Sequence, residues 1–202
     1  MVRVKICGIT RVDDALAAVS AGAWAIGLNF YAQSPRCVAV DVASTIVAAL
    51  PSTTLAVGVF VNESRGRIAE IARRVGLRAI QLHGDESASD CANWPLPVIK
   101  AIRVRERESL ATVDRYPVDF ILLDAYVEGR VGGTGRQFAW EFAAACDRSR
   151  LILAGGLTSE NVAEAVREVR PAAVDVASGV ERSPGVKDVQ LMTRFVANAQ
   201  TA

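Results

Sequence analysis

The sequence predicts an α/β fold, a single (βα)8 (TIM) barrel with a closed, eight-stranded parallel sheet. Eight short runs rich in Val, Ile and Leu recur along the 202 residues, and segments with helical spacing lie between them. The runs are almost continuously apolar, as expected for parallel strands that are buried on both faces. Because no linker or shift in composition interrupts this alternation, we expect one domain over residues 1–202.

The expected strands can be placed in order from the apolar runs. They cover residues 2–7, 23–30, 54–61, 78–83, 97–104, 118–124, 150–156 and 173–179. Alternating strands and helices also fit an open doubly wound sheet, which stays the alternative. The first run, however, lacks the G-x-G-x-x-G fingerprint that marks dinucleotide-binding sheets of that kind.

The helix expected after the third strand shows the clearest pattern. We expect Asn62 to cap it and Gly76 to end it, with one apolar face formed by Ile68, Ile71 and Val75. Similar patterns predict helices over residues 13–21 and after Thr158. The helix expected after the fourth strand has the poorest pattern, because two prolines fall within residues 93–97.

Charge and composition argue against several classes of protein. Twenty-three Lys and Arg nearly balance 22 Asp and Glu, so no overall field attracts nucleic acid or an anionic membrane. No stretch approaches the roughly 20 apolar residues of a membrane span, and the start lacks the apolar core of a secretory signal. Four widely spaced cysteines and one histidine predict no metal site. These features predict a cytoplasmic protein with reduced thiols.

Polar residues end several of the expected strands, and barrel enzymes carry their chemistry at the carboxyl ends of the strands. Cys7 ends the first strand and Asp124 the sixth, where a carboxyl group could donate a proton. Taken alone, Cys7 is best interpreted as a small buried hydrophobic residue, and Asp124 as a helix cap or the partner in an ion pair. In a barrel, however, the carboxyl ends of these two strands lie at the same opening, so the two side chains would face the same cavity. This arrangement favours a shared chemical role. His83 and Arg103 are explained as readily by structural contacts as by contacts with a ligand.

Two glycine-containing segments follow the seventh and eighth strands. Gly155 and Gly156 would let backbone N–H groups approach a ligand closely, and Ser178 and Gly179 would add a hydroxyl and further amides. Either segment alone could be a turn of small residues, but the two in succession predict a phosphate pocket. The glycine-rich stretch 126–138 resembles a mobile lid, with a plain surface loop as the alternative.

Seven segments of the chain resemble signatures of the phosphoribosylanthranilate isomerase family of tryptophan biosynthesis, in the family's order from residue 5 to residue 188. They are KICGIT, SPR, QLHGDE, LLDA, GGTG, LAGGLTSENV and DVASGVERSPGVKD. GGTG or SPR alone would mean little, whereas seven segments in register cover essentially the whole chain. The resemblance implies a (βα)8 isomerase that performs an Amadori rearrangement of N-(5-phosphoribosyl)anthranilate without a cofactor. We expect this small phosphorylated substrate as the partner, and a monomer or a homodimer.

Carried over by motif, the resemblance implies roles for individual residues. Cys7 would be the general base, Asp124 the general acid and Arg36 the clamp on the anthranilate carboxylate, while the segments after strands 7 and 8 would hold the phosphate. A cysteine with its ordinary pKa near 8.5 can supply a thiolate base close to neutral pH, and Gly8 would leave room for the substrate. Ala177 stands where the family usually has serine, which removes one hydroxyl near the phosphate and keeps the backbone amides.

Two other functions stay open from the sequence. The first is another phosphosugar-converting barrel, for instance the related isomerase of the histidine pathway or an enzyme that serves both pathways. Those relatives use aspartate as the base after the first strand, and Cys7 argues against them. A barrel that only binds a phosphorylated metabolite would keep the glycine segments without needing an acid and a base.

Overall fold

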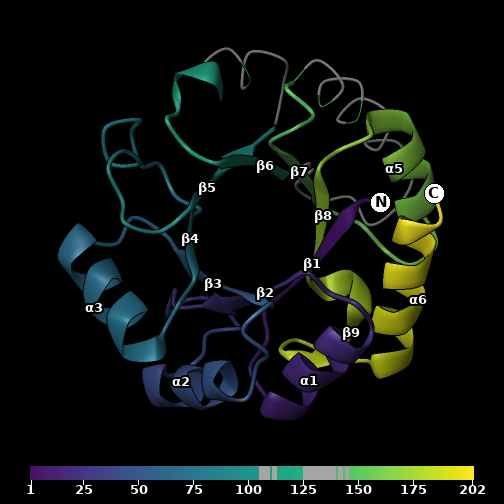
Figure 1. Cartoon of the computed structure of the whole chain (residues 1–202), viewed down its shortest axis with the longest axis horizontal. Coiled ribbons are helices and arrows are strands. Elements are labelled where there is room, and N and C mark those ends of the chain that lie inside the picture. Colours follow the sequence, from purple (N-terminus) through teal and green to yellow (C-terminus); the bar gives the residue numbers. More distant parts are fainter. Residues whose placement is uncertain (105–109, 111–112, 125–139, 141–142, 144–145) are drawn as a thin grey trace.

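The computed structural model describes residues 1–104, 110, 113–124, 140, 143 and 146–202. Eight parallel strands form one closed barrel in the order of the sequence, and β1 pairs with both β2 and β8 (Figure 1). The strands are β1 (Arg3–Cys7), β2 (Ala25–Asn29), β3 (Leu55–Phe60), β4 (Ala79–Leu82), β5 (Val98–Arg103), β6 (Phe120–Asp124), β7 (Leu151–Ala154) and β8 (Ala173–Val176). Each strand lies within the run predicted for it, so the closed barrel is confirmed and the open sheet is excluded.

Helices surround the barrel on its outside (Figure 1). The described helices are α1 (Val12–Ser20), α2 (Val40–Ala48), α3 (Arg65–Val75), α5 (Val162–Val169) and α6 (Val189–Gln200), with short 3-10 segments η2 (Val113–Arg115) and η3 (Ser178–Val180). Two further strands, β9 (Glu181–Ser183) and β10 (Val186–Lys187), form a small antiparallel hairpin after β8. None of the helices in the described part of the chain is long and apolar enough to cross a membrane.

Alternate residues of each strand face the inside of the barrel, because side chains along a strand point to opposite faces in turn. A layer of small and branched side chains fills the centre: Ala25, Val57, Ala79, Ile99, Ala101, Leu122, Ile152, Ala154 and Ala173. On β4, β6 and β8, the next inward-facing residue after this layer is polar. These residues are Gln81, Asp124 and Asp175, and they lie at the carboxyl end of the barrel. The strand pattern thus sets which polar side chains share the mouth.

The start of α3 differs from the sequence-based prediction. Ser64 caps the helix: its backbone is extended and its hydroxyl accepts a hydrogen bond from Arg67 N at 3.3 Å. Asn62 instead has a φ of +50°, and its side-chain oxygen accepts a hydrogen bond from Asp85 N at 2.7 Å. The prediction that Asn62 caps this helix is therefore wrong, because its side chain joins the loop after β4.

Residues 83–97, between β4 and β5, contain no helix. Pro95 and Pro97 lack the N–H group that a helix needs, and the Trp94 indole donates to the carbonyl of Asp90 at 2.8 Å. The helix expected after the fourth strand is absent for this reason. A loop of turns covers this side of the barrel instead.

Candidate active site

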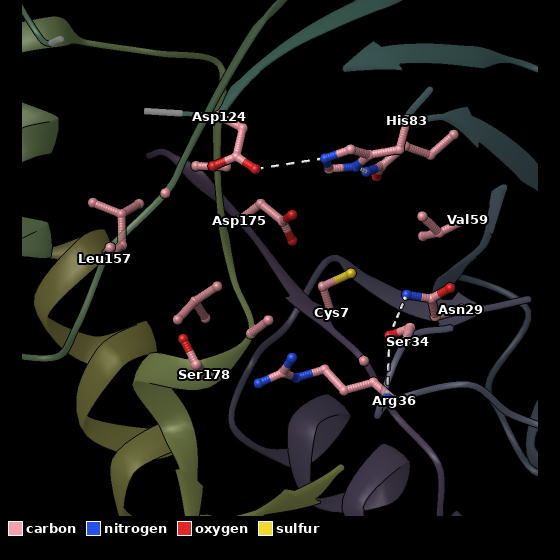
Figure 2. Close-up of a pocket in the computed structure, with 17 residues that line it drawn as sticks. Cys7, Asn29, Ser34, Arg36, Val59, His83, Asp124, Leu157, Asp175 and Ser178 are labelled. Carbon is pink, nitrogen blue, oxygen red and sulfur yellow. Dashed lines mark hydrogen bonds and ion pairs between the residues drawn. The ribbon is translucent and has the colours of Figure 1, made fainter. Parts of the chain in front are cut away.

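A cavity of about 310 Å³ opens at the carboxyl ends of the strands (Figure 2). Of the site residues predicted from the sequence, seven line it: Cys7, Arg36, His83, Asp124, Gly155, Gly156 and Ser178. Arg103 is exposed at the end of β5 and is not among the lining residues. The predicted lid at residues 126–138 lies outside the described residues. The cavity is of the size that holds one small molecule.

The thiol of Cys7 points into this cavity from the end of β1 (Figure 2). Gly27 on the neighbouring strand β2 makes room for it, since a Cβ atom there would lie 2.6 Å from the sulfur. Lys5, two residues earlier on the same face of β1, is fully buried, and its ammonium group donates to Asp175 Oδ1 at 2.9 Å. An ion pair between β1 and β8 therefore lies beneath the thiol.

The charges around Cys7 act in opposite directions on its ionisation. Burial has the largest effect and raises the pKa of the Cys7 thiol, because it disfavours the charged thiolate, and the Asp175 carboxylate raises this pKa further. Lys5 and Lys187 lower this pKa, but the net result stays above the ordinary value. Burial also lowers the pKa of Lys5, yet Asp175 and Cys7 raise it overall, which keeps the ammonium group charged. The thiol is thus mostly protonated at neutral pH, and the expectation of an ordinary pKa for Cys7 is wrong because burial disfavours the thiolate.

Arg36 reaches the cavity across the loop after β1. A Cβ atom on Gly8 would lie 2.5 Å from Arg36 Cδ, and Gly8 has a φ of +76°. Gly8 lines the cavity, and its missing side chain makes room for the aliphatic part of Arg36, so room for the substrate beside Gly8 stays a prediction. The guanidinium group binds the Glu181 carboxylate, with Nη2 at 2.6 Å from Oε2.

On the opposite side of the cavity, Asp124 faces the single histidine of the chain (Figure 2). His83 Nε2 lies 3.5 Å from Asp124 Oδ2, and the Gln81 side-chain nitrogen lies 2.8 Å from His83 Nδ1. In this arrangement the amide donates to Nδ1, so Nε2 carries the proton and faces Asp124. Gln81 is almost fully buried, and its Oε1 has no hydrogen-bond partner among the described residues.

The loops after β7 and β8 form the remaining wall. Gly155 and Gly156 have φ values of +85° and +63°, and a Cβ atom on Gly156 would meet no protein atom within 4 Å. Asn161 holds this turn from behind by donating to the Gly156 carbonyl at 2.9 Å. Ser178 lines the cavity at the start of η3. Gly156 thus faces open space at the cavity, as a phosphate turn requires.

Gly179 has a different place from the other predicted glycines. It is not among the residues that line the cavity, and the position of a Cβ atom there is filled by the carbonyl group of Leu157. Its lack of a side chain lets the loop after β8 pack on the loop after β7. A contact between Gly179 and a ligand stays a prediction.

Among the polar residues at the site that sequence reasoning missed are Gln81 and Asp175, which line the cavity, and Lys5, which lies beneath Cys7. Each interrupts an apolar run, in AIQLH, VDVAS and VKIC respectively, at a position that faces the inside of the barrel. A charged or amide side chain inside a strand buried on both faces is unfavourable without a partner. A polar residue inside an otherwise apolar buried strand was therefore the feature of the sequence that could have identified these residues.

A closed barrel whose mouth combines a thiol, a carboxyl group, a guanidinium group and two glycine-containing loops defines an enzyme for a small anionic ligand. The family model described as N-(5'phosphoribosyl)anthranilate (PRA) isomerase matches residues 4–198. The chain therefore belongs to the N-(5'-phosphoribosyl)anthranilate isomerase family. The family expected from the sequence motifs is confirmed.

Individual relatives agree with this assignment over the full length. The N-(5'-phosphoribosyl)anthranilate isomerase of Pseudomonas fluorescens strain Pf0-1 is 53% identical over 197 residues, which are 96% of this chain and 97% of the relative. The crystal structure of phosphoribosyl anthranilate isomerase from Thermotoga maritima has a TM-score of 0.92 and 42% identity, with 100% of both chains covered. A further crystal structure of a phosphoribosyl anthranilate isomerase contains reduced 1-(o-carboxyphenylamino)-1-deoxyribulose 5-phosphate. It has a TM-score of 0.88 and 39% identity to this chain, with 100% of both chains covered.

Proposed function

We propose that this chain converts N-(5'-phosphoribosyl)anthranilate to 1-(2-carboxyphenylamino)-1-deoxyribulose 5-phosphate in tryptophan biosynthesis, with Cys7 as general base and Asp124 as general acid. The observation that supports these roles most is that β1 and β6 bring a thiol and a carboxyl group to one cavity. The family of the chain supports the reaction and the substrate.

The proposed reaction consists of proton transfers and needs no external oxidant. Asp124 protonates the ring oxygen of the ribose, the bond from C1′ to that oxygen breaks, and the anthranilate nitrogen supplies the electron pair that forms the Schiff base. The thiolate form of Cys7, which is the minor form at neutral pH, then removes the proton from C2′ and becomes the thiol, which gives an enolamine. Transfer of the hydroxyl proton of the enolamine to C1′ yields the ketone, and exchange with solvent then returns a proton to Asp124 and takes one from Cys7. Each catalytic group acts on one atom of the same substrate, which suits two groups on different strands.

The remaining lining residues would bind the two anionic ends of the substrate. Arg36 can hold the anthranilate carboxylate in a two-point hydrogen-bonded pair. Gly155, Gly156 and Ser178 would surround the phosphate with backbone N–H groups and a hydroxyl. His83 would keep Asp124 directed at the ring oxygen. Arg36 comes from the loop after β2, whereas the residues that would surround the phosphate come from the loops after β7 and β8, so the two sets of contacts would hold the substrate at both of its anionic ends.

The cellular setting follows from the same proposal. No disulfide joins the four cysteines in the described part of the chain, which suits a reducing compartment, and we expect the enzyme to act in the cytoplasm. We expect it to bind its phosphorylated substrate as a monomer or a homodimer.

The proposal is tested by the loss of fluorescence of freshly prepared phosphoribosylanthranilate. Asp124→Asn removes the proton donor and should lower kcat about 10²- to 10⁴-fold with little change in KM. Asp13→Asn, at an exposed position on α1, serves as the matched control and should keep full activity. Near-normal kcat in folded Asp124→Asn would contradict the role of the carboxyl group.

The binding roles have their own readout in KM. Arg36→Ala should raise KM about 10²-fold, because a methyl group cannot replace a charged two-point contact. Gly156→Val should weaken inhibition by inorganic phosphate, because the added side chain would fill the proposed phosphate position. Gly76→Val, at a φ of +77° away from the cavity, controls for backbone strain alone. Normal phosphate inhibition in Gly156→Val would place the phosphate elsewhere.

A further inference from the structure

Behind the cavity wall, Arg36 belongs to a cluster with Glu181 and Lys187. Arg36 Nε lies 2.9 Å from Glu181 Oε1 and Arg36 Nη2 lies 2.6 Å from Oε2. Lys187 Nζ donates to the same Oε1 at 2.8 Å. Glu181 and Lys187 come from the motif after β8, in a part of it to which the proposed function gives no role. The motif therefore places an anion beside the cation that should bind the substrate.

Glu181 occupies one edge of the guanidinium group and leaves the other edge available. A guanidinium group has five N–H donors in one plane, and the carboxylate uses the Nε–H and one N–H of Nη2. The Nη1 group and the second N–H of Nη2 have no protein acceptor within the described residues. Arg36 lines the cavity, whereas Glu181 is not a lining residue and its side chain is only 4% exposed. The carboxylate thus holds Arg36 from the protein side.

Glu181 itself is fixed without any ligand. It stands at the start of β9, and Gly185 N donates to its Oε1 at 3.2 Å. The Thr10 hydroxyl in turn donates to the Gly185 carbonyl at 2.5 Å, which ties the hairpin to the loop after β1. Burial raises the pKa of Glu181, but hydrogen bonds from Arg36 and Lys187 lower it below the ordinary value. Glu181 is therefore an ionised and immobile acceptor at neutral pH.

Lys187 keeps the cluster cationic. Its ammonium group uses three hydrogen bonds, to the carbonyl groups of Cys7 at 2.6 Å and Ala177 at 3.1 Å and to Glu181. Burial lowers the pKa of Lys187, and the neighbouring Glu181 carboxylate opposes this shift. With its ammonium group charged, Lys187 and Arg36 contribute two positive charges and Glu181 one negative charge, so the cluster has one net positive charge. Without the lysine, Glu181 would neutralise Arg36 and repel an incoming carboxylate. With it, the arginine is oriented and the site still attracts an anion.

We propose that Glu181 is a positioning residue that fixes the guanidinium group of Arg36 with its free edge toward the carboxylate on the aromatic ring of the substrate. This inference rests on the proposed function of Arg36. A free arginine side chain loses considerable rotational freedom when it is immobilised on binding. Glu181 removes that freedom before the ligand arrives, so the carboxylate meets a donor pair that is already in place.

The test compares two probes that differ in one group. The first is reduced 1-(o-carboxyphenylamino)-1-deoxyribulose 5-phosphate, and the second is its phenylamino counterpart without the carboxylate. In Glu181→Gln, binding of the first probe should weaken about tenfold, and binding of the second should stay unchanged. KM should rise while kcat changes little. Glu70→Gln, an exposed residue on α3, is the matched control and should bind both probes normally.

Three other outcomes would overturn the proposal. Tighter binding of the carboxylate probe by Glu181→Gln would show that Glu181 competes with the ligand for Arg36. If Glu181→Gln lost affinity equally for both probes, Glu181 would only support the structure of the site. In that case Glu181→Asp would not restore normal affinity for either probe. If the unchanged protein bound both probes equally, Arg36 would not hold the carboxylate, and the proposed function of Arg36 would fail together with this inference.

Discussion

The surroundings of Cys7 differ in charge from those of Asp124. Two buried ammonium groups flank the thiol: Lys5, which pairs with Asp175, and Lys187, which donates to the Cys7 carbonyl. Around Asp124, within the described part of the chain, the ion-pair contact is His83 at 3.5 Å, which Gln81 holds through a neutral amide. One wall of the cavity therefore contains buried lysine ammonium groups, whereas on the opposite wall Asp124 faces a histidine that is supported by a neutral amide.

This difference fits the two proton transfers in the proposed reaction. A base that must become a thiolate in a buried place gains from cations, because burial alone disfavours its charged form. An acid that must carry a proton is better without a cation nearby, since a positive charge would favour its carboxylate form. We therefore expect the first wall to favour the thiolate form of Cys7 and the second wall to favour the protonated form of Asp124. Substitutions on either wall test this hypothesis.

The largest effect is expected from removing the base itself. Cys7→Ala should lower kcat about 10²- to 10⁴-fold and leave KM largely unchanged. Cys37→Ala, at an exposed cysteine that does not line the cavity, is the matched control and should keep kcat. Fluorescence-based turnover measures both. If Cys7→Ala kept near-normal turnover, the thiol would only fill space and His83 would become the next candidate for the base.

A smaller effect is expected from removing the cation beneath the thiol. Lys5→Met takes away a positive charge and leaves Asp175 unpaired, and both changes raise the pKa of Cys7. Less thiolate is then present at neutral pH, so alkylation of Cys7 by iodoacetamide and kcat/KM should both fall about tenfold. Both losses should shrink as the pH rises, because the thiol then ionises in either protein.

A second buried lysine provides the control for this substitution. Lys100 pairs with Glu86 at 2.7 Å outside the cavity, and Lys100→Met should lower the free energy of unfolding by about 3–5 kcal/mol, as Lys5→Met should. Alkylation of Cys7 at neutral pH should nevertheless stay normal in Lys100→Met. Equal losses of reactivity in both variants, measured at a temperature where both are folded, would assign the effect to stability alone.

The smallest effect is expected on the acid side. Gln81→Glu places a carboxylate beside His83 Nδ1, which favours the imidazolium form and hence the ionised form of Asp124. We expect kcat to fall about three- to tenfold. The loss should be larger at lower pH, because more of His83 is then in the imidazolium form. Gln81→Met removes the hydrogen bond without adding charge and should cost less. If both variants lost the same activity across the pH range, neutrality of this wall would not matter.

Much of the barrel could be predicted because its signals are local. Each strand is a short apolar run bounded by polar residues, and the side chain that ends a run of a parallel barrel lies at the mouth. Cys7, Asp124 and the paired glycines were found in this way. The cap of α3 and the segment after β4 were predicted wrongly, because Asn62 bonds to a distant loop and two prolines prevent a helix.

The sequence by itself determined the order of strands, the residues at their carboxyl ends and the family, since each depends on neighbouring residues along the chain. Only the tertiary structure decided the charge pairing within the site. Lys5 meets Asp175 across 170 positions of sequence, and Arg36 meets Glu181 across 145. The first contact exists because β8 pairs with β1 and closes the barrel, and the second joins the loop after β2 to β9, which follows β8. No local pattern encodes which cation will face which carboxylate.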